Sequence, residues 1–134
     1  MASELRVDTL KDSSGNNSVG MAYVAGGSAK AWCNLDGTSA TAASDLTGVR
    51  DSFNISAVVD NGVGDYTYVF SNAMSDVNYS FSAAVRGDSA SNDNIFNADF
   101  NHAFSASQLI MRNRDAASAR DSEQACIQTF GDLA

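Results

Sequence analysis

The sequence predicts an all-β protein, an antiparallel β-sandwich of jelly-roll-like type preceded by an extended N-terminal arm. Large apolar residues recur at every second position in short runs, which is the period of a half-buried strand. Gly, Asn and Asp separate these runs, and they must make the turns because the chain has no Pro. The acids are 14 Asp and two Glu, a balance that favours turns and strand ends over helices.

Residues 1–28 are expected to form an anchoring arm and linker, and residues 29–134 the β-sandwich domain. Leu5, Val7 and Leu10 are the apolar residues of the first arm segment, which alternates with charged residues. The polar stretch KDSSGNNS and the short apolar piece MAYVAGG follow. A flexible tail is the alternative, because chain termini are ordered only when something holds them.

The first half of the domain contains three strand-like runs. Residues 29–35 alternate, and residues 49–59 carry one run that continues or restarts after Ile55. The sequence DNGVGD at 60–65 is a strong hairpin signal. The aromatic residues of 66–70 share one face, and the other face is also partly apolar, so we expect this strand to be covered on both sides.

The second half begins with the clearest alternation in the chain, at residues 77–85. A polar loop at 86–94 separates it from the apolar residues of 95–104. Residues 107–112 and 125–134 then provide two further strands, with a second polar loop between them. About eight short strands with frequent turn signals are typical of a β-sandwich.

The expected core is thin for a chain of this length. Leu, Ile, Val and Phe together make up 27 of 134 residues, close to the composition of disordered chains. Small proteins with marginal cores rely on disulfides, metals or oligomerisation, and we expect oligomerisation here. The aromatic residues expected in the core or in a subunit interface are Trp32, Phe53, Tyr66, Tyr68, Phe70, Tyr79 and Phe81.

The charge excludes two classes of partner. The net charge of −8 argues against nucleic acid and against anionic membrane surfaces, both of which require clustered Lys and Arg. No stretch approaches the roughly 18 apolar residues of a membrane span. The charged start MASELRVDTLKD is unlike a signal peptide, so we expect a protein made in the cytoplasm or carried in an assembly built there.

No residue pattern predicts catalysis. Motifs for a nucleophile elbow, a phosphate loop or a zinc protease are absent from the sequence, so His102 has no partner motif. Asp88 and Asp93 could form a glycosidase pair, but Asp in such a chain is more often a turn residue. We therefore expect a protein that is not an enzyme and needs no cofactor.

Metal binding is also not expected. The loops at 14–17, 60–65 and 87–94 offer oxygen ligands, but none has the ligand spacing of a Ca²⁺ loop. Cys33 and Cys126 lie on predicted strands whose proximity the sequence does not give, and free thiols are expected in a reducing cytoplasm.

Two short features have ordinary explanations. Residues 86–88 spell the Arg-Gly-Asp tripeptide that integrins recognise, but a turn at the end of a strand explains it. Trp32, Tyr66 and Tyr68 are candidates for stacking on a sugar ring. Packing in the core or in a subunit interface is the favoured alternative for all three, because the core lacks large residues.

Three stretches of the chain form a recognisable pattern: ELRVDTLKDSSGNNS at residues 4–18, AKAWCNLDGT at residues 29–38, and VRDSFNISAVVDNGVGDYTYVFSNAMSDVNYSF at residues 49–81. Together they resemble a recurring module of bacteriophage tail-fibre and related virion proteins of marine-phage type. The likeness covers residues 4–18 and 29–82, with Ser75 where Pro is usual and Leu35 where an aromatic residue is usual. The matching residues are Lys30, Ala31, Trp32, Gly37, Arg50, Ser52, Phe53, Asn54, Asp60, Asn61, Gly62, Gly64, Asp65, Tyr66, Phe70, Met74 and Tyr79.

The resemblance implies a homotrimeric, β-structured virion protein without catalytic residues. A short tail fibre or tail-associated adhesin is the first expectation. A trimeric head decoration or capsid fibre protein is the alternative, and a carbohydrate-binding β-sandwich module is a further one. The implied partners are two further copies, other virion proteins bound through the arm, and a host surface glycan or receptor.

The unmatched residues 87–122 would then form the variable outer surface, because loops on a rigid scaffold usually carry binding specificity. The candidate recognition residues are Arg86, Asp88, Asn92, Asp93, Arg112 and Arg114.

Overall fold

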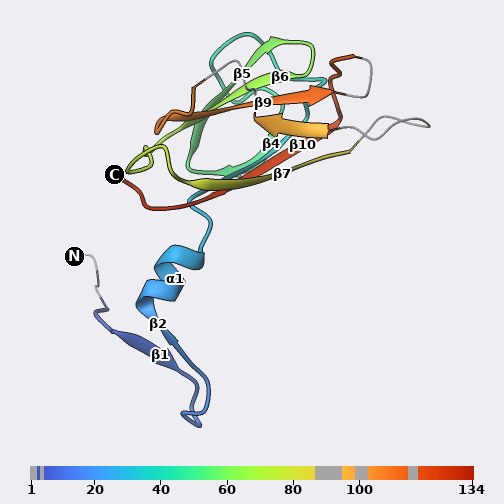
Figure 1. The fold of residues 1–134 in the computed structure, drawn as a ribbon. Coiled ribbons are helices and arrows are strands. Elements are labelled where there is room, and N and C mark those ends of the chain that lie inside the picture. The colour runs from blue at the N-terminus through green and yellow to red at the C-terminus, as the bar shows by residue number, and fades with distance from the viewer. Residues whose placement is uncertain (1–2, 4, 87–94, 99–102, 115–117) are drawn as a thin grey trace.

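The computed structural model describes residues 3, 5–86, 95–98, 103–114 and 118–134. It is mostly β, with 51% of residues in strands, one short helix and antiparallel sheets, which confirms the all-β expectation (Figure 1). The chain consists of an arm, residues 5–28, and a head, residues 29–134.

The arm contains a small hairpin followed by a helix. The hairpin pairs β1 (Thr9–Lys11) with β2 (Ser18–Gly20), and α1 (Met21–Gly27) follows directly. The carboxylate of Asp12 holds the turn by accepting bonds from the side chains of Ser14 and Asn17, at 2.9 and 2.6 Å. Figure 1 shows the arm extending away from the head, to which it is joined at the start of β3.

The described part of the head contains two four-stranded antiparallel sheets. The first has the strand order β4-β3-β10-β7, and the second has the order β5-β6-β9-β8. The strands are β3 (Ala31–Leu35), β4 (Val49–Phe53), β5 (Ile55–Gly62), β6 (Asp65–Phe70), β7 (Ser80–Arg86), β8 (Ile95–Ala98), β9 (Gln108–Arg114) and β10 (Gln124–Phe130).

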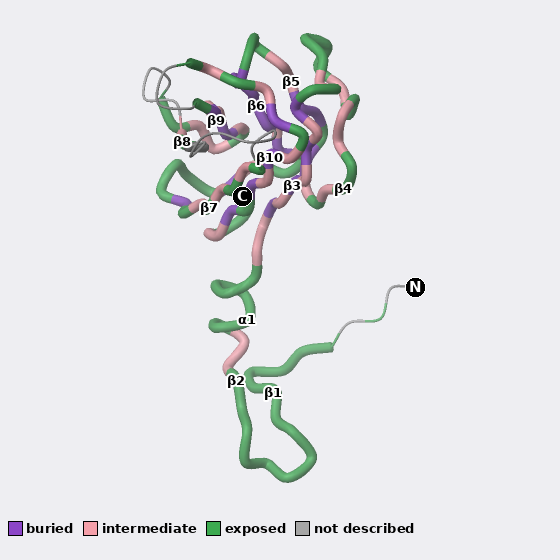
Figure 2. Tube along the Cα trace, turned by 90° about the vertical axis from the view of Figure 1, so that its right-hand side faces the viewer, coloured by how far each residue is buried: buried purple, intermediate pink, exposed green. Residues whose placement is uncertain are grey.

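The two sheets share one hydrophobic core because each strand buries alternate residues. In the first sheet Cys33 on β3 is paired with Ile127 on β10, and both side chains are buried. In the second sheet Tyr68 is paired with Leu109, and its hydroxyl donates to the carbonyl of Ala125 in the first sheet, at 3.5 Å. Figure 2 shows buried residues in both sheets, whereas the arm is exposed over most of its length.

A corner at Asn54 leads the chain from the first sheet into the second, and a tight turn joins β5 to β6. Asn54, between β4 and β5, has a φ of 56°, and its side-chain oxygen accepts the backbone N–H of Asn72 at 2.7 Å. The expected hairpin at residues 60–65 is confirmed: Gly62 and Gly64 have φ angles of 133° and 70°, which side chains disfavour.

The strand directions give the head two ends. At the base, which adjoins the arm, β3, β5, β7 and β9 begin and β4, β6, β8 and β10 end; at the opposite loop end, the directions reverse. The described base comprises residues 28–30, 53–55, 71–80, 103–107 and 131–134, and the described loop end comprises residues 36–48, 60–64, 114 and 118–123.

Candidate functional site

The candidate functional site is the apolar surface of the arm and of the adjoining base. Twelve large hydrophobic residues are exposed in the described chain. Six lie on the arm: Leu5, Val7, Leu10, Val19, Tyr23 and Val24. Four more lie at the base: Phe53, Val77, Phe104 and Leu133.

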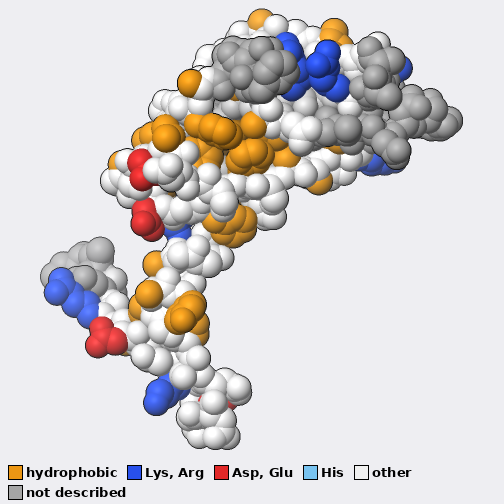
Figure 3. All heavy atoms as spheres, in the orientation of Figure 1, with side chains coloured by type: hydrophobic (Ala, Val, Ile, Leu, Met, Phe, Trp, Pro, Cys, Tyr) orange, Lys and Arg blue, Asp and Glu red, His pale blue; other side chains and the backbone are white. Residues whose placement is uncertain are grey.

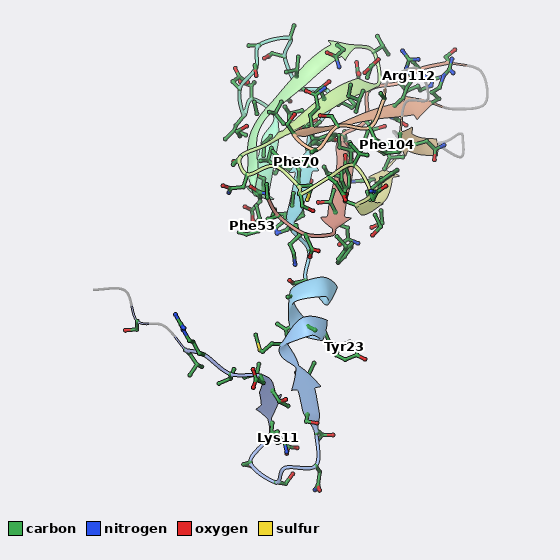
Figure 4. All side chains as sticks on the ribbon, turned by 60° about the vertical axis from the view of Figure 1, so that its left-hand side comes forward. Lys11, Tyr23, Phe53, Phe70, Phe104 and Arg112 are labelled. Carbon is green, nitrogen blue, oxygen red and sulfur yellow. The ribbon has the colours of Figure 1, made fainter. Side chains whose placement is uncertain are left out.

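This distribution is uneven and therefore informative, because scattered single hydrophobic residues would need no explanation. Figure 3 shows hydrophobic side chains along the arm and in the lower half of the head, nearer the arm. Tyr23 projects from α1 into the open and is 78% exposed (Figure 4). An arm and base of this kind can dock on another protein surface.

The base presents its aromatic rings on a built support. Phe104, which is 52% exposed, contacts Tyr79 edge-on, with ring centroids 6.4 Å apart, and Phe81 at 6.1 Å. Tyr79 in turn contacts Phe70 at 5.9 Å, and its hydroxyl donates to the carbonyl of Ser105 at 3.2 Å. The exposed ring of Phe104 is thus held in place by rings that reach the core.

The sequence analysis named part of this surface. Leu5, Val7 and Leu10 are exposed on the arm, as an arm that docks elsewhere requires. It did not single out Tyr23 and Val24, although both lie in the apolar piece MAYVAGG. The helix there was not predicted either, because seven residues with two terminal glycines give little helical signal.

The aromatic residues predicted for the core or an interface separate into two groups. Tyr66, Tyr68, Phe70 and Tyr79 are buried, and Phe81 packs against them from the side. Because the side chains of Tyr66 and Tyr68 are buried, neither can stack on a sugar ring, and that alternative is wrong for both. Trp32 and Phe53 lie next to each other on the outer face of the first sheet, and Phe53 is 54% exposed.

The predicted recognition residues lie toward the loop end where the structure describes them. Arg86 ends β7 and Arg114 ends β9, and both are exposed. The side chain of Arg112 forms an ion pair with Asp65 at 3.0 Å, so it also supports the hairpin of β5 and β6. Figure 3 shows Lys and Arg side chains at this end of the head. Asp88, Asn92 and Asp93 are outside the described residues, as is His102.

A network of buried polar groups at the loop end was missed by the sequence analysis. Asp121 accepts hydrogen bonds from the backbone N–H of Gly64 and from the hydroxyl of Tyr66, both at 2.7 Å. Burial, and then the bond to Asp121, raises the pKa of Tyr66. Nearby, the side-chain amide of Asn113 donates to the hydroxyl oxygen of Ser122 at 2.7 Å. Such long-range pairs leave no sequence signal.

The loops considered as metal ligands use their oxygens to hold turns. Asp60 accepts the N–H of Gly62 at 2.8 Å, and the Asn61 amide donates to Asp65 at 3.2 Å. Among the described residues no group of three His, Cys, Asp or Glu side chains is placed to hold a metal ion. The loop at 87–94 is outside the described residues.

Cys33 and Cys126 are free thiols on neighbouring strands. Because Cys33 is paired with Ile127 and Cys126 with Asn34, the two side chains lie on opposite faces of the sheet. Cys33 faces the core, and burial raises its pKa to about 12. Cys126 faces outward, and partial burial raises its pKa as well.

The described chain has no helix long and apolar enough to cross a membrane. Comparisons with protein-family models, with curated proteins and with solved structures gave no match to this chain. The features of the molecule itself therefore carry the functional argument.

Proposed function

We propose that this chain is a non-enzymatic structural protein of a bacteriophage virion, a short trimeric tail fibre or tail-associated adhesin. The observation that carries the proposal is the arm, which leaves the head and keeps its large apolar side chains exposed in a single chain. The likeness of residues 4–18 and 29–82 to phage virion modules supplies the virion context.

The arm cannot be stable alone. Its strands have three residues each, and α1 has seven, whereas isolated helices shorter than about 12 residues and lone two-stranded hairpins are marginal in water. None of the residues of α1 is buried in the single chain. A partner surface would cover these side chains and supply the missing stabilisation.

We propose two kinds of partner. Two further copies of the chain would cover the base and the helix around a threefold axis, and other virion proteins would receive the hairpin of β1 and β2. Association would also bury the large apolar residues that the arm and the base leave exposed, which add nothing to the core of a single chain. The loop end, opposite the arm, would then point away from the particle.

A trimeric head decoration or capsid fibre protein is the second candidate, because it would need the same arm and the same base. A carbohydrate-binding module is a further candidate and is taken up below for one surface.

Immunogold electron microscopy of phage particles with an antibody against the head tests the proposal. Label at the tail tip or tail shaft is expected. Label at the threefold positions of the capsid would replace the tail-fibre role with the decoration role. Particles that carry no label, in a lysate where the chain is detected outside the virions, would overturn the virion role altogether.

A further inference from the structure

The outer face of the first sheet carries a shallow hollow of about 360 Å³. It lies over β3, β10 and β7, on the side that faces away from the core. The side chains that line it from this side are Trp32, Asn34, Cys126, Gln128, Ser82 and Ala84.

The strand register explains the shape of the hollow. Trp32, Gln128 and Ser82 lie on one rung across three strands, and Asn34, Cys126 and Ala84 lie on another. The residues on β7 are small, whereas β3 carries the large indole ring. The ring of Trp32 therefore forms one wall of the hollow, and the small residues of β7 leave space opposite it.

The polar groups of the hollow are amides and a hydroxyl, and none of its lining residues is charged. The Gln128 side-chain amide donates to the hydroxyl oxygen of Ser82 at 2.7 Å. The side-chain oxygen of Asn34 is shielded from solvent and accepts no hydrogen bond. Because that oxygen is shielded, a ligand in the hollow would meet the exposed side chains of Gln128 and Ser82 instead.

We propose that this hollow binds a neutral saccharide. The apolar face of a pyranose ring would stack on Trp32, and its hydroxyls would exchange hydrogen bonds with the exposed side chains of Gln128 and Ser82. The absence of charge in the lining selects a neutral sugar over an acidic one. The inference rests on the proposed attachment role for its biological purpose.

A second copy of this chain fits the hollow less well. The exposed large hydrophobic residues concentrate on the arm and the base, which are the surfaces that a copy would cover, and of these residues Phe53 lies beside the hollow, next to Trp32. Burying the exposed amide of Gln128 against an apolar surface would cost the hydrogen bonds that it makes to water. Nucleic acid fits no better, because the hollow offers no cation for a phosphate.

Trp32 is the single tryptophan of the chain, so its fluorescence reports on the hollow directly. The full chain is titrated with neutral oligosaccharides from dextran, mannan and galactan, and with acidic oligogalacturonate. We expect at least one neutral series to shift the emission to shorter wavelength and to protect Trp32 from acrylamide quenching. Oligogalacturonate should do neither. Absence of any response to all three neutral series, or a response to oligogalacturonate alone, would overturn the proposal.

Variants show where the saccharide binds. Their binding is measured by calorimetry, because Trp32→Ala removes the fluorophore. Trp32→Ala and Gln128→Ala should each weaken binding at least about tenfold. Val63→Ala, which shortens an exposed apolar side chain at the loop end, should bind as the unmodified chain does. Equal binding by all three variants would contradict the assignment of the hollow.

Light scattering on the same samples separates this proposal from the proposed function. A trimer without saccharide binding would sink only the saccharide site, whereas a saccharide-binding monomer would sink only the trimer. A trimer in which acrylamide cannot reach Trp32 before any sugar is added would show that a copy covers the hollow, and would also overturn the saccharide site.

Discussion

Gly64 is a tightly constrained residue at the loop end of the head. A Cβ atom at this position would lie 2.4 Å from the carbonyl oxygen of Asn113 and 2.7 Å from that of Arg120. Its φ of 70° also disfavours any side chain. The backbone of Gly64, in the turn between β5 and β6, therefore packs directly against the backbone of Asn113 on β9 and of Arg120 in the segment before β10.

Replacement of Gly64 by Ala should therefore destabilise the head by at least about 3 kcal/mol, because steric overlap adds to backbone strain. Gly62→Ala is the matched control, since Gly62 lies in the same turn with a φ of 133° and open space around it. It should cost about 1–3 kcal/mol, less than at Gly64, because it meets backbone strain without steric overlap. Urea unfolding measures both, and equal losses would contradict the close packing at Gly64.

The Cys33 thiol gives the folded chain a pH dependence. Burial raises its pKa from 9.0 to about 12, so the unfolded chain loses this proton at lower pH than the folded chain. The contribution of Cys33 to the free energy of unfolding is therefore fully present below pH 9 and is lost as the pH rises from 9 towards 12.

Urea midpoints measured at pH 7, 8, 9 and 10 should be level up to about pH 8 and fall above it. In Cys33→Ala the fall between pH 8 and pH 9 should be smaller, although the variant is less stable throughout. The tyrosines, with an ordinary pKa of 10.0, contribute mainly above this window. A fall of the same size in Cys33→Ala would show that Cys33 does not titrate as its burial requires.

At the scale of the elements, the arm is the part in which none of the described residues is buried. Tyr23 is the largest exposed side chain of α1. Lys30 caps the helix by donating from Nζ to the carbonyl of Ala25 in its last turn, and it also donates to the carbonyl of Ser28 at 3.1 Å. The helix has no acidic residue in its first turn and no basic residue in its last. Its stability must come from packing.

Replacement of Tyr23 by Ala should leave the unfolding of the head unchanged but weaken self-association, because this exposed side chain would contact the other copies in the proposed trimer. The expected effect is a loss of about tenfold or more in association, measured by sedimentation at a series of concentrations. Val63→Ala, another exposed apolar truncation, should not change it. Parallel effects from the two variants would contradict a specific role for α1.

The strands were predictable from the sequence where one face is buried. The alternation of residues 107–112 became β9, with Leu109 and Met111 buried, and the alternation before Phe130 became β10. Val77 is a miss: the run from 77 was expected to be buried at every second residue, but β7 begins at Ser80 and Val77 is 46% exposed.

The partition of strands into two sheets was not predictable. It depends on corners such as Asn54, where an unusual φ and hydrogen bonds to Asn72 turn the chain from one sheet to the other. Asn tolerates this conformation, but the sequence around it reads as one continuing strand. The polar network of Asp121 and the side-chain oxygen of Asn34 likewise depend on tertiary contacts that have no periodicity.

At the scale of the whole molecule, the head has two chemically different ends. The base and the arm expose aromatic and aliphatic side chains, and the loop end carries ion pairs such as Arg112 with Asp65 and the exposed residues Arg86 and Arg114. Figure 4 shows Phe53 on the side of the head nearer the arm and Arg112 far from it. This polarity suits a protein held at one end and exposed at the other.

The arrangement of the whole molecule also accounts for the scarcity of large apolar residues in the core. About a fifth of the residues are Leu, Ile, Val or Phe. Many of the exposed large hydrophobic residues lie on the arm and base, where they add nothing to the core of a single chain. Association of copies would recover that burial. The composition indicates a shortage of large apolar residues, and the fold shows that several of them lie on the exposed arm and base and not in the core.

The mass of the full chain in solution, measured by light scattering during size-exclusion chromatography, tests the central claim most directly. We expect a particle of three copies, three times the 14.0 kDa of one chain, that persists on dilution into the micromolar range. A stable, folded particle with the mass of one chain at the same concentrations would contradict it.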